Sequence, residues 1–184
     1  MGSLSKRLMN RMRHLARSED GTATIPFVMF VPFYMLLLLS SIEMGMLMIR
    51  HVMLERALDI AVRDLRLGTW NPPTNTDLKR RICRSAGLIP DCMNVLMVEL
   101  RPVSKTTWSP LASGPTCVDR NASIQPVTSF VAGTSNDMML IRVCAKFDPI
   151  FPTTGLGSSL PKDNSGAYAL VSSTAFVNEP RPGS

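Results

Sequence analysis

The sequence predicts an α+β protein in which a long N-terminal transmembrane helix is followed by a small, disulfide-stabilised domain. That domain is expected to contain one short helix and an antiparallel sheet of about three strands. Three observations predict this class: an apolar run over residues 25–49, later segments that alternate apolar and polar side chains, and four cysteines that all follow the run. The 184 residues thus divide into a cytoplasmic leader (1–21), a transmembrane and membrane-proximal helix (22–71) and an extracytoplasmic domain (72–184).

The leader is basic and predicts the orientation of the helix. It holds five basic residues against two acidic ones, a balance of 5 − 2 = +3. Residues 72–184 also carry 11 − 8 = +3, but spread over a much longer segment. The positive-inside rule therefore keeps the leader in the cytoplasm and sends the domain across the membrane. Half of the net charge of +6 lies in the leader, where orientation in the membrane and attraction to anionic lipid explain it. Nucleic-acid binding is therefore not expected.

The apolar run is long enough to cross a membrane as a helix. A helix rises about 1.5 Å per residue and the hydrocarbon core is about 30 Å thick, so about 20 residues suffice. The run exceeds the apolar region of a cleaved secretory signal and lacks a small-residue cleavage site, so the anchor is expected to stay. Apolar residues then recur at helical spacing from Leu54 to Leu65, and Gly68 offers a C-cap. One continuous helix is predicted over residues 24–67.

Three residues inside this helix are unusual for a membrane span. Pro26 falls in the first turn, where a missing N–H is tolerated, and Pro32 is expected to bend the helix. Glu43 places a carboxylate in or beside hydrocarbon, which costs on the order of a few kcal/mol unless the group finds water or a partner. Two interpretations stay open: Glu43 lies near the outer boundary and reaches water, or it contacts a neighbouring helix.

The extracytoplasmic segment is long enough for a domain with its own core. A short helix is expected over residues 76–86, with Thr76 as N-cap and Gly87 as terminator. The Pro-, Gly- and Ser-rich segments 104–115 and 151–166 are expected to be loops. An alternating pattern predicts a strand over residues 95–103, and two further strands are expected over residues 138–147 and 168–177.

The four cysteines predict two disulfides in an oxidising compartment, with three possible connectivities. We favour Cys83 with Cys92 and Cys117 with Cys144, whose loop closures stabilise the domain by about 2.6 and about 3.6 kcal/mol in the chain-entropy model. A zinc site is disfavoured because close C-x-x-C spacing is missing and both histidines precede the domain.

The search for catalytic groups predicts neither an enzyme nor a cofactor. Because the domain sequence has no histidine, Ser-His and Cys-His pairs and H-E-x-x-H metal sites are excluded there. The glycine-containing segment 155–159 lacks the lysine of a phosphate-binding loop and is expected to be a flexible turn. Four carboxylates are expected to be solvated turn residues: Asp119, Asp137, Asp148 and Asp163.

The N-terminal half carries a family resemblance. The segment E-D-G-T-A-T-I-P-F at residues 19–27, then Pro32, then I-E-M-G at residues 42–45, resembles the TadE-type pseudopilins of the bacterial tight-adherence (Tad, or Flp) pilus system. The domain resembles the same group around its cysteines and in F-V-N-E-P at residues 176–180.

This resemblance implies assembly without catalysis, as a minor pseudopilin or pilus assembly component of the inner membrane. A prepilin peptidase would cut after Gly21 and leave Thr22 as the new N-terminus. The implied partners are the lipid bilayer, other pilus or pseudopilin subunits and the inner-membrane assembly platform. Helix packing would involve Pro26, Phe27, Pro32, Glu43 and Gly45.

One position departs from the family pattern. Members usually carry a glutamate five residues after the cut, where this chain has Pro26. Two outcomes stay open: the chain is processed and enters the pilus, or it remains an uncut inner-membrane component. The alternative function is an anchored periplasmic binding or scaffolding module unrelated to pili.

Overall fold

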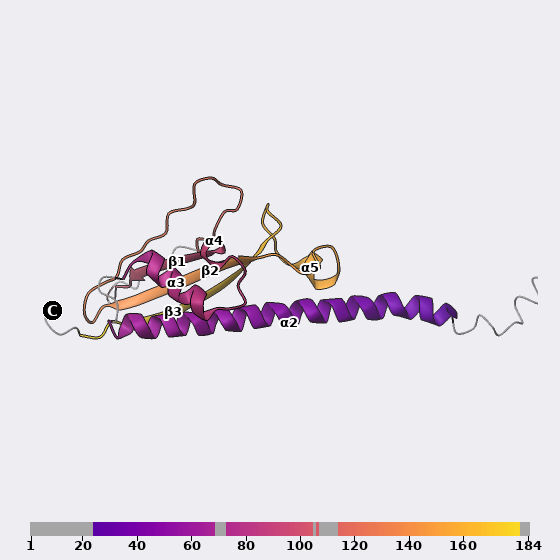
Figure 1. Ribbon diagram of the computed structural model, residues 1–184, viewed down its shortest axis with the longest axis horizontal. Helices are drawn as coiled ribbons and strands as arrows, with labels where there is room; N and C mark the ends of the chain where they lie inside the picture. Colours follow the sequence, from indigo (N-terminus) through magenta and orange to yellow (C-terminus); the bar gives the residue numbers. More distant parts are fainter. Residues whose placement is uncertain (1–23, 69–72, 105, 107–113, 181–184) are drawn as a thin grey trace, which may run out of the picture.

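The computed structural model describes residues 24–68, 73–104, 106 and 114–180. One long helix, α2 (Thr24–Arg66), runs the length of the molecule, and a sheet with short helices is stacked on its C-terminal half (Figure 1). The basic leader, with the expected cleavage site at Gly21 and Thr22, lies outside the described residues.

Helix α2 is continuous, as the sequence predicts. Its 43 residues extend about 64 Å and pass through Pro32 without a break. The helix ends at Arg66, and Gly68 just beyond it has a φ of 66° and donates its N–H to the Leu65 carbonyl at 3.1 Å. Since this left-handed conformation suits glycine, the predicted C-cap is confirmed.

The short helix α3 (Asn75–Ser85) begins earlier than predicted. Thr74, not Thr76, is the N-cap: its hydroxyl accepts a hydrogen bond from the Asp77 N–H at 3.1 Å. The threonine hydroxyl in turn donates to the Asp77 carboxylate at 2.6 Å, which fixes the cap geometry. A further single-turn helix, α4 (Cys92–Val95), leads directly into the sheet and was not predicted.

The sheet has three antiparallel strands in the order β1-β2-β3. Strand β1 (Leu96–Pro102) is one residue shorter at each end than predicted, whereas β2 (Met138–Phe147) and β3 (Tyr168–Val177) match the predicted ranges. The alternation in β1 is also confirmed, because Leu96, Val98 and Leu100 are all buried on one face.

The core lies between the inner face of the sheet, α3 and the C-terminal half of α2. Each of these elements contributes one apolar face, as the helical and strand periodicities predict. Its most deeply buried side chains are Leu54, Leu58, Leu78, Ile82, Leu96, Leu100, Met139, Ile141, Val143 and Phe147.

Two disulfides close the domain, and they join the pairs that the sequence favours. Cys83 is bonded to Cys92, which links α3 to α4, and Cys117 is bonded to Cys144, which draws a long connection onto the outer face of β2. On that face Arg142 forms an ion pair with Glu99 at 3.2 Å. The outer face of the sheet is therefore polar where the connection crosses it.

Candidate functional site

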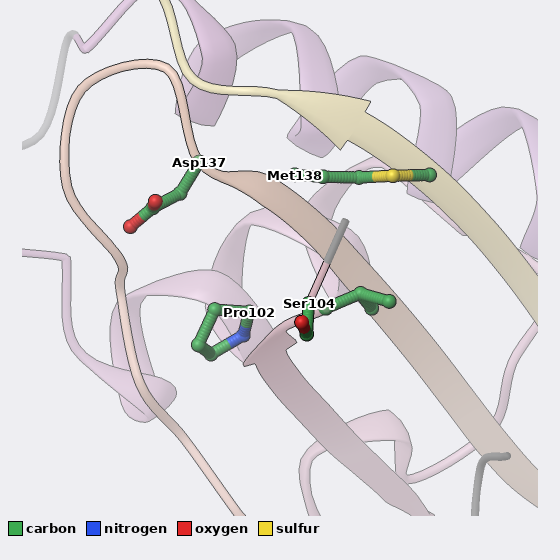
Figure 2. Close-up of a pocket in the computed structure, with 5 residues that line it drawn as sticks. Pro102, Ser104, Asp137 and Met138 are labelled. Carbon is green, nitrogen blue, oxygen red and sulfur yellow. The ribbon is translucent and has the colours of Figure 1, made fainter. Parts of the chain in front are cut away.

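A shallow hollow of about 450 Å³ lies at the end of the sheet (Figure 2). It is lined by Pro102, Val103, Ser104, Asp137 and Met138. Figure 2 shows the side chains of Asp137 and Met138 pointing away from each other. The Asp137 carboxylate accepts hydrogen bonds from the N–H and the hydroxyl of Thr134, at 2.7 and 2.8 Å. The hollow thus lacks the convergent polar groups of a ligand site.

The other three aspartates are held within loops and do not converge. Asp119 accepts from the Asn121 N–H at 2.9 Å and Asp148 pairs with Arg120 at 2.6 Å. Asp163 pairs with Lys146. Within the described residues, no group of three or more His, Cys, Asp or Glu side chains could hold a metal ion.

The N-terminal half of α2 carries more than half of the exposed large apolar side chains of the described residues. Helix α2 is also the one helix among the described residues that is long and apolar enough to cross a membrane. Pro26, Phe27 and Pro32 are exposed on this half. Gly45 is exposed as well, and a Cβ atom added there would meet nothing within 4 Å. Four of the five predicted helix-packing residues are therefore uncovered by their own chain.

Glu43 is the exception, with only 1% of its surface exposed. Its carboxylate accepts hydrogen bonds from two consecutive backbone N–H groups, those of Ile150 (2.9 Å to Oε2) and Phe151 (2.9 Å to Oε2). Oε1 lies 3.2 Å from the same Ile150 nitrogen. The charge is thus compensated by backbone donors of a loop more than 100 positions along the chain.

This loop, residues 148–163, connects β2 to the segment before β3 and is called the α5 loop here. It contains the single-turn helix α5 (Gly155–Ser159), which lies beside the middle of α2, away from the sheet (Figure 1). The expectation of a flexible turn over residues 155–159 is therefore wrong. The segment is helical because it packs on α2, a contact that local sequence does not reveal.

Two further polar side chains of α2 hold the α5 loop. The Ser40 hydroxyl accepts from the Leu156 N–H at 3.3 Å and donates to the Leu36 carbonyl at 2.8 Å. Arg50 donates to the Asp148 carbonyl at 3.1 Å and to the Tyr168 hydroxyl at 2.7 Å.

We call Ser40, Glu43 and Arg50 the polar seam. They lie on one face of α2, because steps of three and seven residues return to nearly the same side of a helix. The α5 loop runs along this face toward the N-terminus of α2. Three polar residues at such spacing in an apolar helix are the sequence signal that could have identified the contact face.

Two glycines allow close backbone packing of the loop: Gly157 against the loop itself and Gly155 against the polar seam. A Cβ atom at Gly157 would lie 2.2 Å from the Phe151 carbonyl oxygen and 3.5 Å from Glu43 Oε2. At Gly155, where φ is 52°, a Cβ atom would lie 2.2 Å from the Ser40 hydroxyl. A larger residue at Gly155 would push the loop away from α2, and one at Gly157 would distort the loop itself.

Lysines close the loop at two places. Lys162 donates to the carbonyls of Pro152 (3.0 Å) and Gly157 (2.9 Å). At the base of the loop, Lys146 pairs with Asp163, whose carboxylate also accepts from Ser165. The Lys146 ammonium, followed by the Ser165 hydroxyl, holds the pKa of Asp163 well below its usual range.

The structure corrects the interpretation of Glu43 as a side chain that reaches water. Its carboxylate is covered by the α5 loop and satisfied by backbone donors. Every residue except proline has a backbone N–H, so the sequence does not reveal which of these groups binds Glu43. Sequence reasoning could therefore identify Glu43 as unusual without identifying its partner.

No match to this chain was found among protein-family models, curated proteins or solved structures.

Proposed function

We propose that this protein is a TadE-like minor pseudopilin or pilus assembly component of a Tad/Flp-type pilus, acting without catalysis. In this function α2 spans the inner membrane as a single pass, with the leader cytoplasmic and the disulfide-bonded domain periplasmic. Its apolar half contacts lipid and the helices of other pilus subunits or of the assembly platform. The domain contacts those partners outside the membrane.

The observation that carries the proposal is the division of α2 into two halves. One face of the C-terminal half is buried in the domain core, whereas the N-terminal half is exposed except on the face where the α5 loop covers Ser40 and Glu43. Gly45 belongs to the uncovered surface, and small residues at such places let helices approach closely within a membrane. The resemblance of the I-E-M-G segment to the pseudopilins supports the same assignment.

Cleavage by a prepilin peptidase between Gly21 and Thr22 remains part of the proposal, with Pro26 as the departure from the family pattern. The intact mass of protein extracted from membranes distinguishes the two forms. A mass that begins at Thr22 identifies a processed subunit. A mass that begins at Met1 or Gly2 identifies an uncut membrane component.

Piliation of a strain that lacks the gene tests the function. We expect no pili in this strain, and recovery with the wild-type gene. Gly45→Leu is expected not to restore pili, because the larger side chain keeps a neighbouring helix at a distance. Val52→Leu is the matched control, since Val52 is 57% exposed on the same helix. Normal piliation of the deletion strain would contradict the proposal and favour a binding or scaffolding module unrelated to pili.

A further inference from the structure

The position of the α5 loop along α2 places it near one surface of the membrane that α2 would cross. The axis of the helix rises about 24 Å from Thr24 to Ser40 and about 28 Å from Thr24 to Glu43. A hydrocarbon core about 30 Å thick that begins near Thr24 therefore ends beside the contact between α2 and the loop.

Other placements of the span lead to the same result. The nearest flanking charges are Asp20 before the apolar run and Arg50 after it. A span of about 20 residues that begins at Thr24, the start of α2, ends near residue 43, and every later start moves the boundary toward Arg50. Ser40 thus lies at the outer boundary or inside it in each placement.

The backbone of the α5 loop is suited to this depth. Non-helical backbone is tolerated at membrane depth only where its polar groups have partners. Here Glu43 satisfies two N–H groups, Ser40 satisfies the Leu156 N–H, and Lys162 satisfies two carbonyls. The Ser158 hydroxyl donates to the Gly155 carbonyl at 2.8 Å.

The side chains of the loop present apolar surface around these satisfied groups. Ile150 is 40% exposed, and Phe151, Leu156 and Leu160 are half-buried. Exposed threonines and serines lie between them. Segments that lie in the boundary between headgroups and acyl chains bury apolar side chains such as Phe and Leu there and leave polar ones outside.

We infer that the α5 loop is a second membrane contact, which inserts Ile150, Phe151 and Leu156 into the interfacial region of the outer leaflet. The polar seam holds the loop at this depth, and the loop in turn sets how far the domain stands above the membrane. The inference rests on the proposed function only through the membrane span of α2, and it does not depend on a role in a pilus.

Depth-dependent fluorescence quenching tests the inference on the full chain. Trp70 and Trp108 are replaced by phenylalanine, and single tryptophans are introduced as Leu156→Trp, Ile124→Trp or Phe30→Trp. Each protein is reconstituted into vesicles of phosphatidylcholine and phosphatidylglycerol, with or without brominated acyl chains. Ile124, 84% exposed on a different loop, is the matched control, and Phe30, 69% exposed on α2, reports the span itself.

We expect Leu156→Trp to lose roughly half or more of its emission to lipids brominated near the headgroup, since interfacial side chains enter about 5–10 Å. Ile124→Trp should respond to aqueous acrylamide and not to brominated lipid. Ile150→Trp serves as a second reporter of the loop if Leu156→Trp does not fold.

Three outcomes overturn the inference. If Phe30→Trp is quenched by brominated lipid but both loop reporters behave like Ile124→Trp, α2 spans the membrane and only the loop contact fails. If Phe30→Trp is also unquenched, the membrane span fails as well. If the loop reporters are shielded from both quenchers, the loop contacts protein instead of lipid.

Discussion

Glu43 is the residue whose environment says most about how the molecule is held together. A buried carboxylate would be strongly destabilising without partners. Here two backbone N–H groups act as those partners, so the charge joins α2 to a loop 107 positions further along the chain. Bonds to an ionised acceptor are stronger than neutral ones, and burial of Glu43 shields them from water.

Glu43→Ala should release the α5 loop. The substitution leaves the Ile150 and Phe151 N–H groups without their acceptor, at a cost of about 1–3 kcal/mol for each group that stays buried. Hydrogen exchange at these two amides is expected to accelerate in detergent-solubilised protein. Glu55→Ala is the matched control, because Glu55 lies on the same helix with half of its side chain exposed. Unchanged exchange in Glu43→Ala would show that the carboxylate does not hold the loop.

Gly157→Ala tests the tight packing of the α5 loop backbone on itself, against the Phe151 carbonyl. The added Cβ atom would lie 2.2 Å from a backbone carbonyl oxygen, which cannot move away as a side chain can. We expect destabilisation of about 1–3 kcal/mol, measured by thermal unfolding in detergent. Gly45→Ala, with open space around its Cβ position, should stay within about 1 kcal/mol of wild type. Equal thermal unfolding midpoints for Gly157→Ala and Gly45→Ala would rule out tight packing at Gly157.

Among the elements, the α5 loop depends most on contacts far along the chain. Its base is closed by the ion pair between Lys146 on β2 and Asp163, and its tip is held by the Ser40 hydroxyl, which accepts from the Leu156 N–H. The two sets of contacts act on the same loop from opposite ends.

The Asp163 ion pair predicts a pH dependence. Because the folded pKa of Asp163 lies below its unfolded value, its contribution is present above the unfolded pKa, about 3.9 for an aspartate, and is lost as pH falls toward the folded pKa. In the wild-type protein, the Ser165 and Ala167 amide protons should lose their protection from hydrogen exchange as pH falls below about 4. Asp163→Asn should show weaker protection at neutral pH and little further change in acid. A parallel acid loss in both proteins would exclude this carboxylate as the cause.

The two disulfides are expected to contribute unequally. In the chain-entropy model, closing the longer Cys117–Cys144 loop stabilises by about 3.6 kcal/mol and closing the Cys83–Cys92 loop by about 2.6 kcal/mol. Chemical denaturation of the two double alanine variants should therefore rank Cys117→Ala/Cys144→Ala as less stable. The reverse order would mean that the contact between α3 and α4 depends more on its disulfide than loop closure predicts.

Sequence patterns predicted the elements whose determinants are local. The predicted bounds of strands β2 and β3 match the structure, and Gly68 marks the end of α2 because its left-handed conformation favours glycine. The N-cap of α3 was misplaced because both Thr74 and Thr76 are good caps, and the choice depends on Asp77. Helix α5 was missed because tertiary contacts with α2 stabilise it.

At the scale of the whole molecule, α2 joins two environments. Its C-terminal half is part of the domain core, and its N-terminal half is uncovered over most of its circumference (Figure 1). The polar seam lies where these halves meet, so movement of the apolar half is coupled to the domain through the α5 loop. In the proposed function, this junction transmits the position of the membrane helix to the periplasmic domain.

The most direct test of the proposed function is a photocrosslink from α2 in living cells. A photoreactive amino acid in place of Gly45 lies on the uncovered surface of the helix, where its side chain meets no atom of its own chain within 4 Å of the Cβ position. Mass spectrometry of the adducts identifies the neighbour. The proposed function predicts a crosslink to another pilus subunit or to the inner-membrane assembly platform. Adducts only with proteins unrelated to pili, in cells that assemble them, would contradict it.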